Sequence, residues 1–331
     1  MSLAIDKAWK YQLLTYPNPA VGCTVVKNDT VLAVGVHQYA GGPHAEVNAL
    51  KEAYLSLNPN SSLKDIEDSH KIHDFLKENH NGFLEDCEVY VTLEPCNHMG
   101  KTPACAVLLK ELNPKKVYIS VLDPNENASG GKQRLEDAGI EVESNLLNEE
   151  GKNLLKPFSS WHKDKFVFFK IAMRRDGSVT GGYITTQDSL NLVHEIRTKI
   201  NLMVIGGNTV RTDRPTLDSR FSESKKASDI LIYSSQKEFD KNIKLFGVAN
   251  REVKISNKLE LDKNFIMIEG GLNLLNQLKD KVDMFMIFIS HKDKNLELID
   301  LEKKYKIKKL FSYKINQLDE VVFYEKQSPI N

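Results

Sequence analysis

Four residues in the first third of the chain combine metal-binding side chains with one that can move protons: His44, Glu46, Cys96 and Cys105. One imidazole and two thiolates give Zn²⁺ three protein ligands and leave a fourth position for water, as catalysis requires. Zinc lowers the pKa of such a water toward neutrality. Because Glu46 lies two residues after His44 at an expected helix start, its carboxylate can face the same cavity and transfer the water proton. This pattern predicts zinc-dependent hydrolytic chemistry.

Alternating strands and helices are expected to position these side chains, which indicates an α/β layer structure. In the first half we predict strands at 21–26, 31–36, 88–93 and 116–121, and helices at 2–14, from 43, at 104–112 and at 132–138. The polar stretch 55–85 is predicted to be a surface insertion. A second series is predicted to have strands at 166–173, 202–205, 230–233, 265–268, 284–290, 310–313 and 321–324, and helices at 189–199 and 272–278.

The length of 331 residues favours two domains, and 41% apolar with 27% charged residues is typical of a globular protein. We place a first domain at 1–150, a junction at 151–165 and a second domain at 166–331. No run of apolar residues approaches the length of a membrane span. The N-terminal residues lack the basic start and apolar core of a signal peptide, so we expect a cytoplasmic protein without a membrane partner.

The formal net charge of zero conceals an asymmetry between the halves. Residues 1–150 carry 13 basic and 22 acidic side chains, a net charge of −9, and residues 151–331 carry the opposite excess. A nucleic-acid binder needs a basic surface to contact phosphates, so the first half argues against a nucleic-acid partner. The basic second half suits a phosphorylated small ligand. Glycine pairs at 206–207 and 270–271 follow expected strands there, and such turns can present N–H groups to phosphate.

The segment from Glu94 to Cys105 has a more specific pattern, Pro-Cys-x-His-x-Gly-x-Thr-Pro-x-Cys, in place of the Pro-Cys-x-x-Cys of the general zinc-deaminase signature. Together with the runs 17–23, 43–47 and 123–125, it resembles the bifunctional deaminase–reductase family of riboflavin biosynthesis over nearly all of residues 1–150. The resemblance implies a cytidine-deaminase-like three-layer αβα domain. It also implies hydrolytic deamination of 2,5-diamino-6-(5-phosphoribosylamino)pyrimidin-4-one.

The family's site residues carry over by position. His44, Cys96 and Cys105 would bind zinc, and Glu46 would be the catalytic proton shuttle. The residues that would line the deaminase substrate pocket are Asn18, His37, His98, Lys101, Asp123 and Asn125.

The second half resembles the family's reductase at 170–172, 176–177, 193–197, 207–217 and 269–271. This implies a dihydrofolate-reductase-like α/β domain that uses NADPH to reduce the ribosyl group to ribityl, giving 5-amino-6-(5-phosphoribitylamino)uracil. By position, the cofactor would contact Ala172, Tyr183, Thr209, Asp213 and Gly271. The substrate would contact Arg197, Leu217, Arg220 and Glu269. Family membership also implies a homo-oligomer.

Three departures keep an alternative open. Arg174 and Arg175 replace the Ser-Leu of most members, and Gly181 and Tyr183 replace a Ser and a Trp. The second half is also somewhat short for the family. A deaminase with a catalytically degenerate reductase-like domain, used for binding or oligomerisation, is therefore the competing hypothesis. A nucleic-acid deaminase is disfavoured by the negative first half and the long spacing between the two cysteines. A structural zinc protein is disfavoured because three ligands are evident instead of four.

Overall fold

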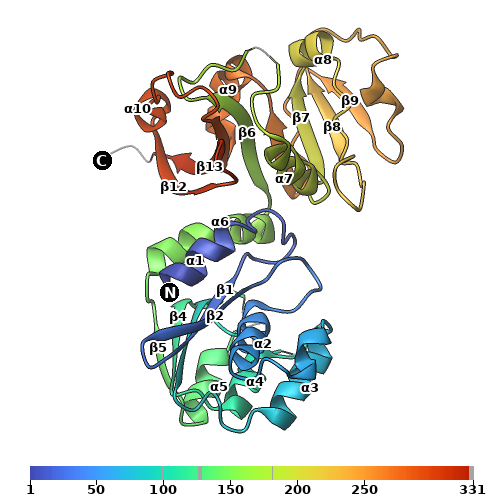
Figure 1. The fold of residues 1–331 in the computed structure, drawn as a ribbon. Helices are drawn as coiled ribbons and strands as arrows, with labels where there is room; N and C mark the ends of the chain where they lie inside the picture. Colours follow the sequence, from blue (N-terminus) through green and yellow to red (C-terminus); the bar gives the residue numbers. More distant parts are fainter. Residues whose placement is uncertain (99, 101, 126–128, 181, 328–331) are drawn as a thin grey trace. The chain divides into compact units, whose positions relative to one another are not determined.

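Two compact units make up the computed structural model, residues 1–158 and 159–331, and each is described by itself (Figure 1). The structure describes residues 1–98, 100, 102–125, 129–180 and 182–327. The division between the units falls inside helix α6 (Asn148–Lys163), where we expected a junction of mixed polarity instead of a regular element.

The N-terminal unit contains a five-stranded sheet with the order β2-β1-β3-β4-β5. Strand β1 pairs antiparallel with both β2 and β3, whereas β3, β4 and β5 run parallel to one another. The strands are β1 (Gly22–Lys27), β2 (Thr30–Val36), β3 (Cys87–Leu93), β4 (Lys116–Val121) and β5 (Glu141–Ser144). The predicted strands of this half lie within one residue of β1 to β4.

Helices cover both faces of this sheet, and two glycines permit the closest approaches. A Cβ on Gly22 would lie 2.1 Å from the carbonyl oxygen of Ala4 in α1 (Ser2–Trp9). A Cβ on Gly35 would lie 2.2 Å from the backbone nitrogen of Ala49 in α2 (Ala45–Leu57). Because Gly35 pairs with Cys23 and not Gly22, the two helices lie on opposite faces. Figure 1 shows the helices α2, α3 (Ser69–Asn79), α4 (Cys105–Leu112) and α5 (Gly131–Asp137) gathered along one side of the sheet, which completes three αβα layers.

The polar stretch 55–85 differs from the expected surface insertion. It forms the short 3₁₀ helix η1 (Ser62–Asp65) and helix α3 (Ser69–Asn79), which contacts α2 and α4 (Cys105–Leu112). Its apolar residues Leu63, Ile72 and Leu76 are fully buried in the core of the unit. The spacing of Ile72 and Leu76 puts both on one face of α3, so a segment of polar composition still packs.

The C-terminal unit contains an eight-stranded sheet with the order β12-β13-β11-β6-β10-β7-β8-β9. The strands from β11 to β9 in this order are parallel, and β13 and β12 are antiparallel additions at one edge. Their bounds are β6 (Phe166–Arg174), β7 (Leu202–Gly206), β8 (Asp229–Tyr233), β9 (Val253–Ser256), β10 (Phe265–Glu269), β11 (Met284–Ser290), β12 (Ile307–Lys314) and β13 (Asp319–Lys326).

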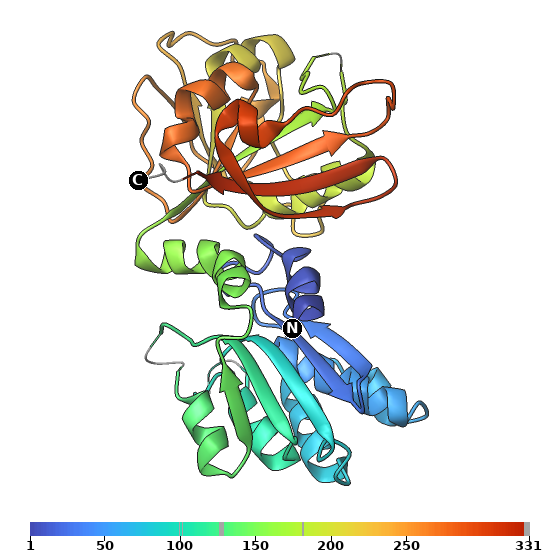
Figure 2. The ribbon, with the colours of Figure 1, turned by 90° about the vertical axis from the view of Figure 1, so that its left-hand side faces the viewer.

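Both faces of this sheet are buried, as a mainly parallel sheet requires. Val167 and Phe169 of β6 pack with the apolar residues of α9 (Leu272–Leu278) and α10 (Leu301–Tyr305). Phe166 points to the opposite face and meets the Trp161 ring of α6 edge-on at 6.0 Å. Figure 2 shows the helices of this unit around the sheet. The α/β fold class expected for both halves is confirmed.

Helix α7 (Gln187–Arg197) is anchored by a side chain from the start of strand β13. Asp319 of β13 is buried, and one of its carboxylate oxygens accepts hydrogen bonds from the backbone N–H and the hydroxyl of Thr186, both at 2.6 Å. The Ser189 hydroxyl donates to the same oxygen at 2.5 Å. This carboxylate therefore caps the N-terminus of the helix from a distant part of the chain.

In the described part of the chain, none of the helices combines the length and apolar composition needed to cross a bilayer.

Gly35→Ala should destabilise the N-terminal unit, because the added Cβ meets backbone atoms of α2 that cannot move without shifting the helix. We expect the free energy of unfolding to fall by about 3 kcal/mol, measured by urea denaturation of the full chain. Gly247→Ala is the matched control, since a Cβ there meets no atom within 4 Å. Equal free energies of unfolding for the two variants would show that α2 does not pack as closely against β2 as described.

Candidate active sites

Three possible metal ligands converge at the ends of three elements in the N-terminal unit. His44 is the N-cap of α2, Cys96 follows β3, and Cys105 is the first residue of α4. Their ligand atoms all lie within 4.8 Å of one another. The sheet therefore brings together residues that are separated by as many as 61 positions in the sequence.

The distances within this group fit zinc. The Nδ1 atom of His44 lies 3.5 Å from Cys96 Sγ and 3.4 Å from Cys105 Sγ. A tetrahedral zinc with ordinary Zn–N and Zn–S bonds would hold such atoms about 3.5 Å apart. One imidazole and two thiolates are also the donor set that Zn²⁺ accepts in catalytic sites.

Contacts around the group orient its ligands for a metal. The Nε2 atom of His44 lies 3.1 Å from the Thr102 hydroxyl, which leaves Nδ1 directed at the two sulfurs. The backbone N–H of Cys105 donates to Cys96 Sγ at 3.3 Å. A hydrogen bond from the Cys105 thiol is the largest of several effects that lower the pKa of Cys96 despite its burial. This favours the Cys96 thiolate, the form that binds metals.

Glu46 lies beside the ligand group in the first turn of α2, and only 4% of it is exposed. Burial raises the pKa of its carboxyl to about 7, against the opposing effect of His44. A carboxyl that titrates near neutral pH can both accept and return a proton, which suits a general acid–base.

Asn18 and His37 form one side of this site. The His37 ring meets the His44 ring edge-on at 5.5 Å. Burial lowers the pKa of His37 to about 4, so its imidazole is neutral at pH 7. Its Nδ1 lies 3.0 Å from the carbonyl oxygen of Pro43, and its Nε2 lies 3.0 Å from Asn18 Nδ2. In the tautomer that satisfies both contacts, His37 donates to Pro43 and accepts from Asn18.

The buried carboxylate of Glu94 holds both the residue that follows the loop entry after β4 and the start of helix α5 (Gly131–Asp137). Its Oε2 accepts the backbone N–H of Asp123, and its Oε1 accepts those of Gly130 and Lys132, each at 3.0 Å. Glu94 lies two residues before the ligand Cys96, so one short segment carries both the metal ligand and the anchor of this loop. Within the loop, the Asp123 carboxylate accepts the backbone N–H of Asn125 at 2.9 Å.

The structure places the remaining predicted deaminase residues as follows. Asp123 and Asn125 lie in the loop that Glu94 anchors, after β4. His98 is exposed in the segment between the two cysteine ligands. Lys101 lies outside the described residues. The structure thus brings Asn18, His37 and Glu46 to the ligand group, and among the described residues it gives His98 no hydrogen bond or ion pair that would define its role.

In the C-terminal unit, a half-buried ion triad forms where strand β10 ends beside β6. Glu269 ends β10 and accepts hydrogen bonds from Lys170 of β6 at 2.8 Å and from Arg197 of α7 at 2.9 Å. Burial by itself would raise the pKa of Glu269, but the two cations hold it well below its usual range. Ligands of parallel α/β sheets bind at this edge.

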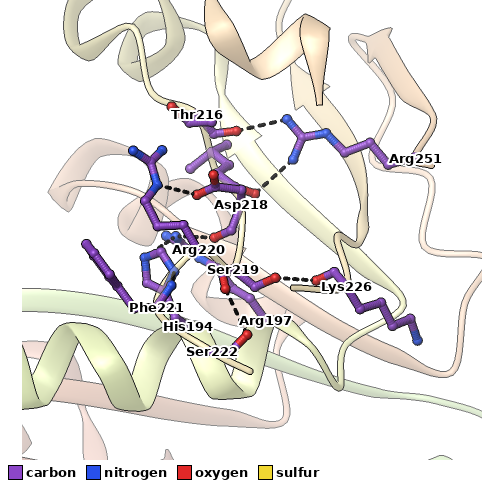
Figure 3. Close-up of polar contacts among 11 residues, drawn as sticks. His194, Arg197, Thr216, Asp218, Ser219, Arg220, Phe221, Ser222, Lys226 and Arg251 are labelled. Carbon is purple, nitrogen blue, oxygen red and sulfur yellow. Dashed lines mark hydrogen bonds and ion pairs between the residues drawn. The ribbon is translucent and has the colours of Figure 1, made fainter. Parts of the chain in front are cut away.

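A turn at 216–220 extends from the triad, and Figure 3 shows its polar contacts. Arg197 also donates to the carbonyl oxygen of Asp218 at 3.2 Å, and the Asp218 carboxylate accepts from Arg220 Nε at 2.8 Å. Leu217 lies in the same turn with a φ of 55°. The four residues predicted to contact the reductase substrate, Arg197, Leu217, Arg220 and Glu269, therefore belong to one connected group.

Three of the five residues predicted to contact the cofactor lie in segments that follow strands at the same edge of the sheet. Thr209 and Asp213 belong to α8 (Gly207–Asp213), which follows β7, and Gly271 is the N-cap of α9, which follows β10. Strands β7 and β10 are neighbours, so these turns are adjacent. A Cβ on Gly271 would meet no atom within 4 Å, which leaves the backbone open to a ligand. Ala172 lies within β6, and Tyr183 is 84% exposed. The open backbone at Gly271 and the exposed aromatic ring of Tyr183 fit a nucleotide cofactor.

The unusual arginines contact backbone carbonyls of nearby loops. Arg174 donates to Thr180, and Arg175 donates to Lys294 at 3.3 Å. Both side chains therefore support loops next to the predicted reductase site. Gly181, the other departure from the family pattern, lies outside the described residues.

Comparison with known proteins identifies the family. A family model described as the cytidine and deoxycytidylate deaminase zinc-binding region matches residues 1–121. A riboflavin biosynthesis protein RibD from Aquifex aeolicus is 32% identical over 295 residues, which cover 84% of this chain and 75% of the relative. The chain belongs to the RibD family. The RibD protein of Haemophilus influenzae is 37% identical over 231 residues, which cover 67% of this chain and 55% of the relative, so that match spans little more than half of it.

A solved structure supports the same family over both units. The Thermotoga maritima protein titled diaminohydroxyphosphoribosylaminopyrimidine deaminase/5-amino-6-(5-phosphoribosylamino)uracil reductase is 26% identical, with a TM-score of 0.61. The match covers 98% of this chain and 97% of that chain. The RibD resemblance inferred from the sequence motifs is therefore confirmed.

Four residues with evident structural roles were not predicted: Glu94, Thr102, Asp218 and Arg251. Glu94 and Thr102 lie inside the quoted cysteine motif, so their position beside the ligands was a usable signal. Asp218 directly follows the matched run 207–217. Arg251 lies outside every motif, and its contacts with backbone carbonyls leave no pattern in a single sequence.

Cys105→Ser should abolish stoichiometric zinc binding, because a serine hydroxyl is a poor substitute for a thiolate ligand. Metal content after dialysis, measured by mass spectrometry, tests this. Cys87→Ser is the matched control: its thiol donates to the Phe83 carbonyl at 3.3 Å, a contact that a hydroxyl can replace. Zinc retained by Cys105→Ser at the wild-type level would contradict the proposed ligand set.

Glu94→Gln should loosen the loop that contains Asp123, because an amide has one acceptor oxygen where the carboxylate uses two. We expect a loss of about 1–3 kcal/mol in the free energy of unfolding. We also expect faster hydrogen exchange at the Asp123, Gly130 and Lys132 amides. Glu88→Gln, which changes a carboxylate that accepts from the Tyr90 hydroxyl, is the control. Unchanged exchange at those amides in Glu94→Gln would refute the anchoring role.

Proposed function

We propose that this chain is a bifunctional enzyme of riboflavin biosynthesis. It deaminates 2,5-diamino-6-(5-phosphoribosylamino)pyrimidin-4-one, and it then reduces the ribosyl group with NADPH to give 5-amino-6-(5-phosphoribitylamino)uracil. The observation that carries this proposal is the buried Glu46 beside a His-Cys-Cys group, in a chain of the RibD family. Residues 1–150 supply the deaminase and 166–331 the reductase, joined through 151–165.

In the deaminase site, His44, Cys96 and Cys105 would hold Zn²⁺, which would supply a water molecule of lowered pKa next to the pyrimidine ring. Glu46 accepts a proton from this water as the carbon–oxygen bond forms. It then donates a proton to the exocyclic amine as the carbon–nitrogen bond breaks, so ammonia leaves and the carboxylate is restored. A carboxyl pKa of about 7 suits both transfers near neutral pH.

Other residues of this unit orient the substrate. His37 holds the Asn18 amide, and Glu94 holds the loop with Asp123 and Asn125, so these polar side chains face the pyrimidine and the ribose from fixed positions. Lys101 and His98 complete the pocket in this proposal and contribute positive or polar contacts to the ribose phosphate.

In the reductase site, NADPH supplies the hydride for reduction at the ribosyl C1 carbon. The cofactor is held by Ala172, Tyr183, Thr209, Asp213 and Gly271. The substrate is held by Arg197, Leu217, Arg220 and Glu269. The two arginines pair with its phosphate. Among the described residues, no observation favours the deaminase-only alternative. We further propose a cytoplasmic homo-oligomer with a phosphoribosyl-pyrimidine substrate and no nucleic-acid or membrane partner.

The test follows ammonia release and NADPH oxidation together in zinc-loaded wild-type protein. Ammonia should appear first, followed by consumption of NADPH. Glu46→Gln should retain zinc but lose about 10²–10⁴-fold in the rate of ammonia release, because it cannot transfer protons.

The reductase provides an internal control for that variant. Glu46→Gln should still oxidise NADPH when it is given 5-amino-6-(5-phosphoribosylamino)uracil. Ammonia release without NADPH oxidation in the wild type would favour the deaminase-only alternative. A zinc-loaded wild type that releases no ammonia would overturn the substrate assignment.

A further inference from the structure

The backbone of the turn at 214–217 is in a conformation that needs support. Arg214 and Leu217 have φ values of 45° and 55°, in the left-handed region that side-chain-bearing residues seldom adopt. Such a conformation persists only where surrounding contacts hold it. Leu217 is 8% exposed, so the turn also brings an apolar side chain against the protein.

Arg251 supplies that support from a different part of the chain. Its Nη1 donates to the Leu217 carbonyl oxygen at 2.8 Å, and its Nη2 donates to the Thr216 carbonyl oxygen at 2.9 Å. The Nη2 also donates to the carbonyl oxygen of Leu245 in η2 (Lys244–Gly247). One guanidinium thus ties two consecutive peptide groups of the turn to a second segment, a geometry that its planar fork of donors allows.

Arg197 holds the next peptide group of the same turn. Its Nη1 donates to the Asp218 carbonyl oxygen at 3.2 Å, and its Nη2 pairs with Glu269 at 2.9 Å. Figure 3 shows Arg251 and Arg197 reaching this turn from separate elements. Three successive carbonyl groups, of residues 216, 217 and 218, are therefore directed toward two arginines. Because these carbonyl groups are held in place, the side chains of the turn are held in one orientation as well.

We propose that Arg251 is a positioning residue for the reductase substrate: it holds the 216–220 turn so that Leu217 and Arg220 meet the substrate in a fixed orientation. The inference rests on the proposed reductase function, because the turn has a substrate to position only if the unit is a reductase. Arg251 itself bonds the backbone of the turn and of η2, so it acts through the turn and not on the reacting atoms.

A positioning role differs from a purely structural one in its kinetic effect. Arg251→Ala should raise the KM for 5-amino-6-(5-phosphoribosylamino)uracil about tenfold or more, since charge-assisted hydrogen bonds to the turn are lost. The KM for NADPH should change by less than about twofold, because the helices that follow β7 and β10 are untouched. Ammonia release by the N-terminal unit should be unchanged.

Two further variants complete the design. Arg251→Lys keeps a cation and some donors and should recover part of the lost affinity. Lys254→Ala is the control, because it removes a neighbouring exposed cation that pairs only at the surface with Glu260. If Arg251→Ala reduces kcat in proportion to the unfolded fraction while the substrate KM stays at the wild-type value, the residue is merely structural and the proposal is overturned.

Calorimetric titration with the same uracil compound separates this proposal from the proposed function. If the wild type binds it but does not oxidise NADPH, the reductase assignment fails, whereas weaker binding by Arg251→Ala and partial recovery by Arg251→Lys still support the positioning role. Equal dissociation constants for wild type and Arg251→Ala overturn the positioning role even if NADPH is oxidised. A wild type that neither binds nor reduces the compound overturns both.

Discussion

The Glu94 carboxylate accepts three backbone N–H groups, one from Asp123 after β4 and two from Gly130 and Lys132 at the start of α5. This interaction illustrates the constraint on which both sites depend. Loops that carry binding residues expose peptide groups that must be satisfied if the loop is to be ordered. In the C-terminal unit the same need is met with the opposite charge, since Arg251 and Arg197 donate to three successive carbonyls. A buried charged side chain thereby fixes a functional loop more firmly than neutral contacts would.

Much of the fold follows from local pattern, but the segments that departed from expectation share a cause. Residues 151–165 contain Pro157 and two serines, which suggested a junction, yet Leu154, Leu155, Phe158 and Trp161 form the apolar face of α6. Strand β9, at the sheet edge, has four residues and no fully buried side chain, so its sequence carries little strand signal. In both cases tertiary packing decided what composition left ambiguous.

The residues of the candidate sites whose side chains bind a ligand could be predicted from the sequence. The residues whose side chains hold the backbone of another segment could not. His44, Cys96 and Cys105 are recognisable by type and spacing, and the fold brings them together. The roles of Asp319 and Arg251 could not be predicted in this way. Each side chain bonds to backbone atoms of a segment more than thirty positions away in the sequence. A single sequence records which residue is present but not which distant peptide group it satisfies.

The position of Arg251 has a consequence for how this chain can change over evolution. Connections between strands at the protein surface ordinarily accept insertions and deletions, because few contacts depend on their length. The connection from β8 to β9 is long and carries a 3₁₀ helix, so it looks like such a segment. Yet Arg251 must emerge from it at one place to reach residues 216 and 217. A change of length between η2 and β9 would carry Arg251 away from these carbonyl groups, so a connection of ordinary appearance contains a part of fixed length.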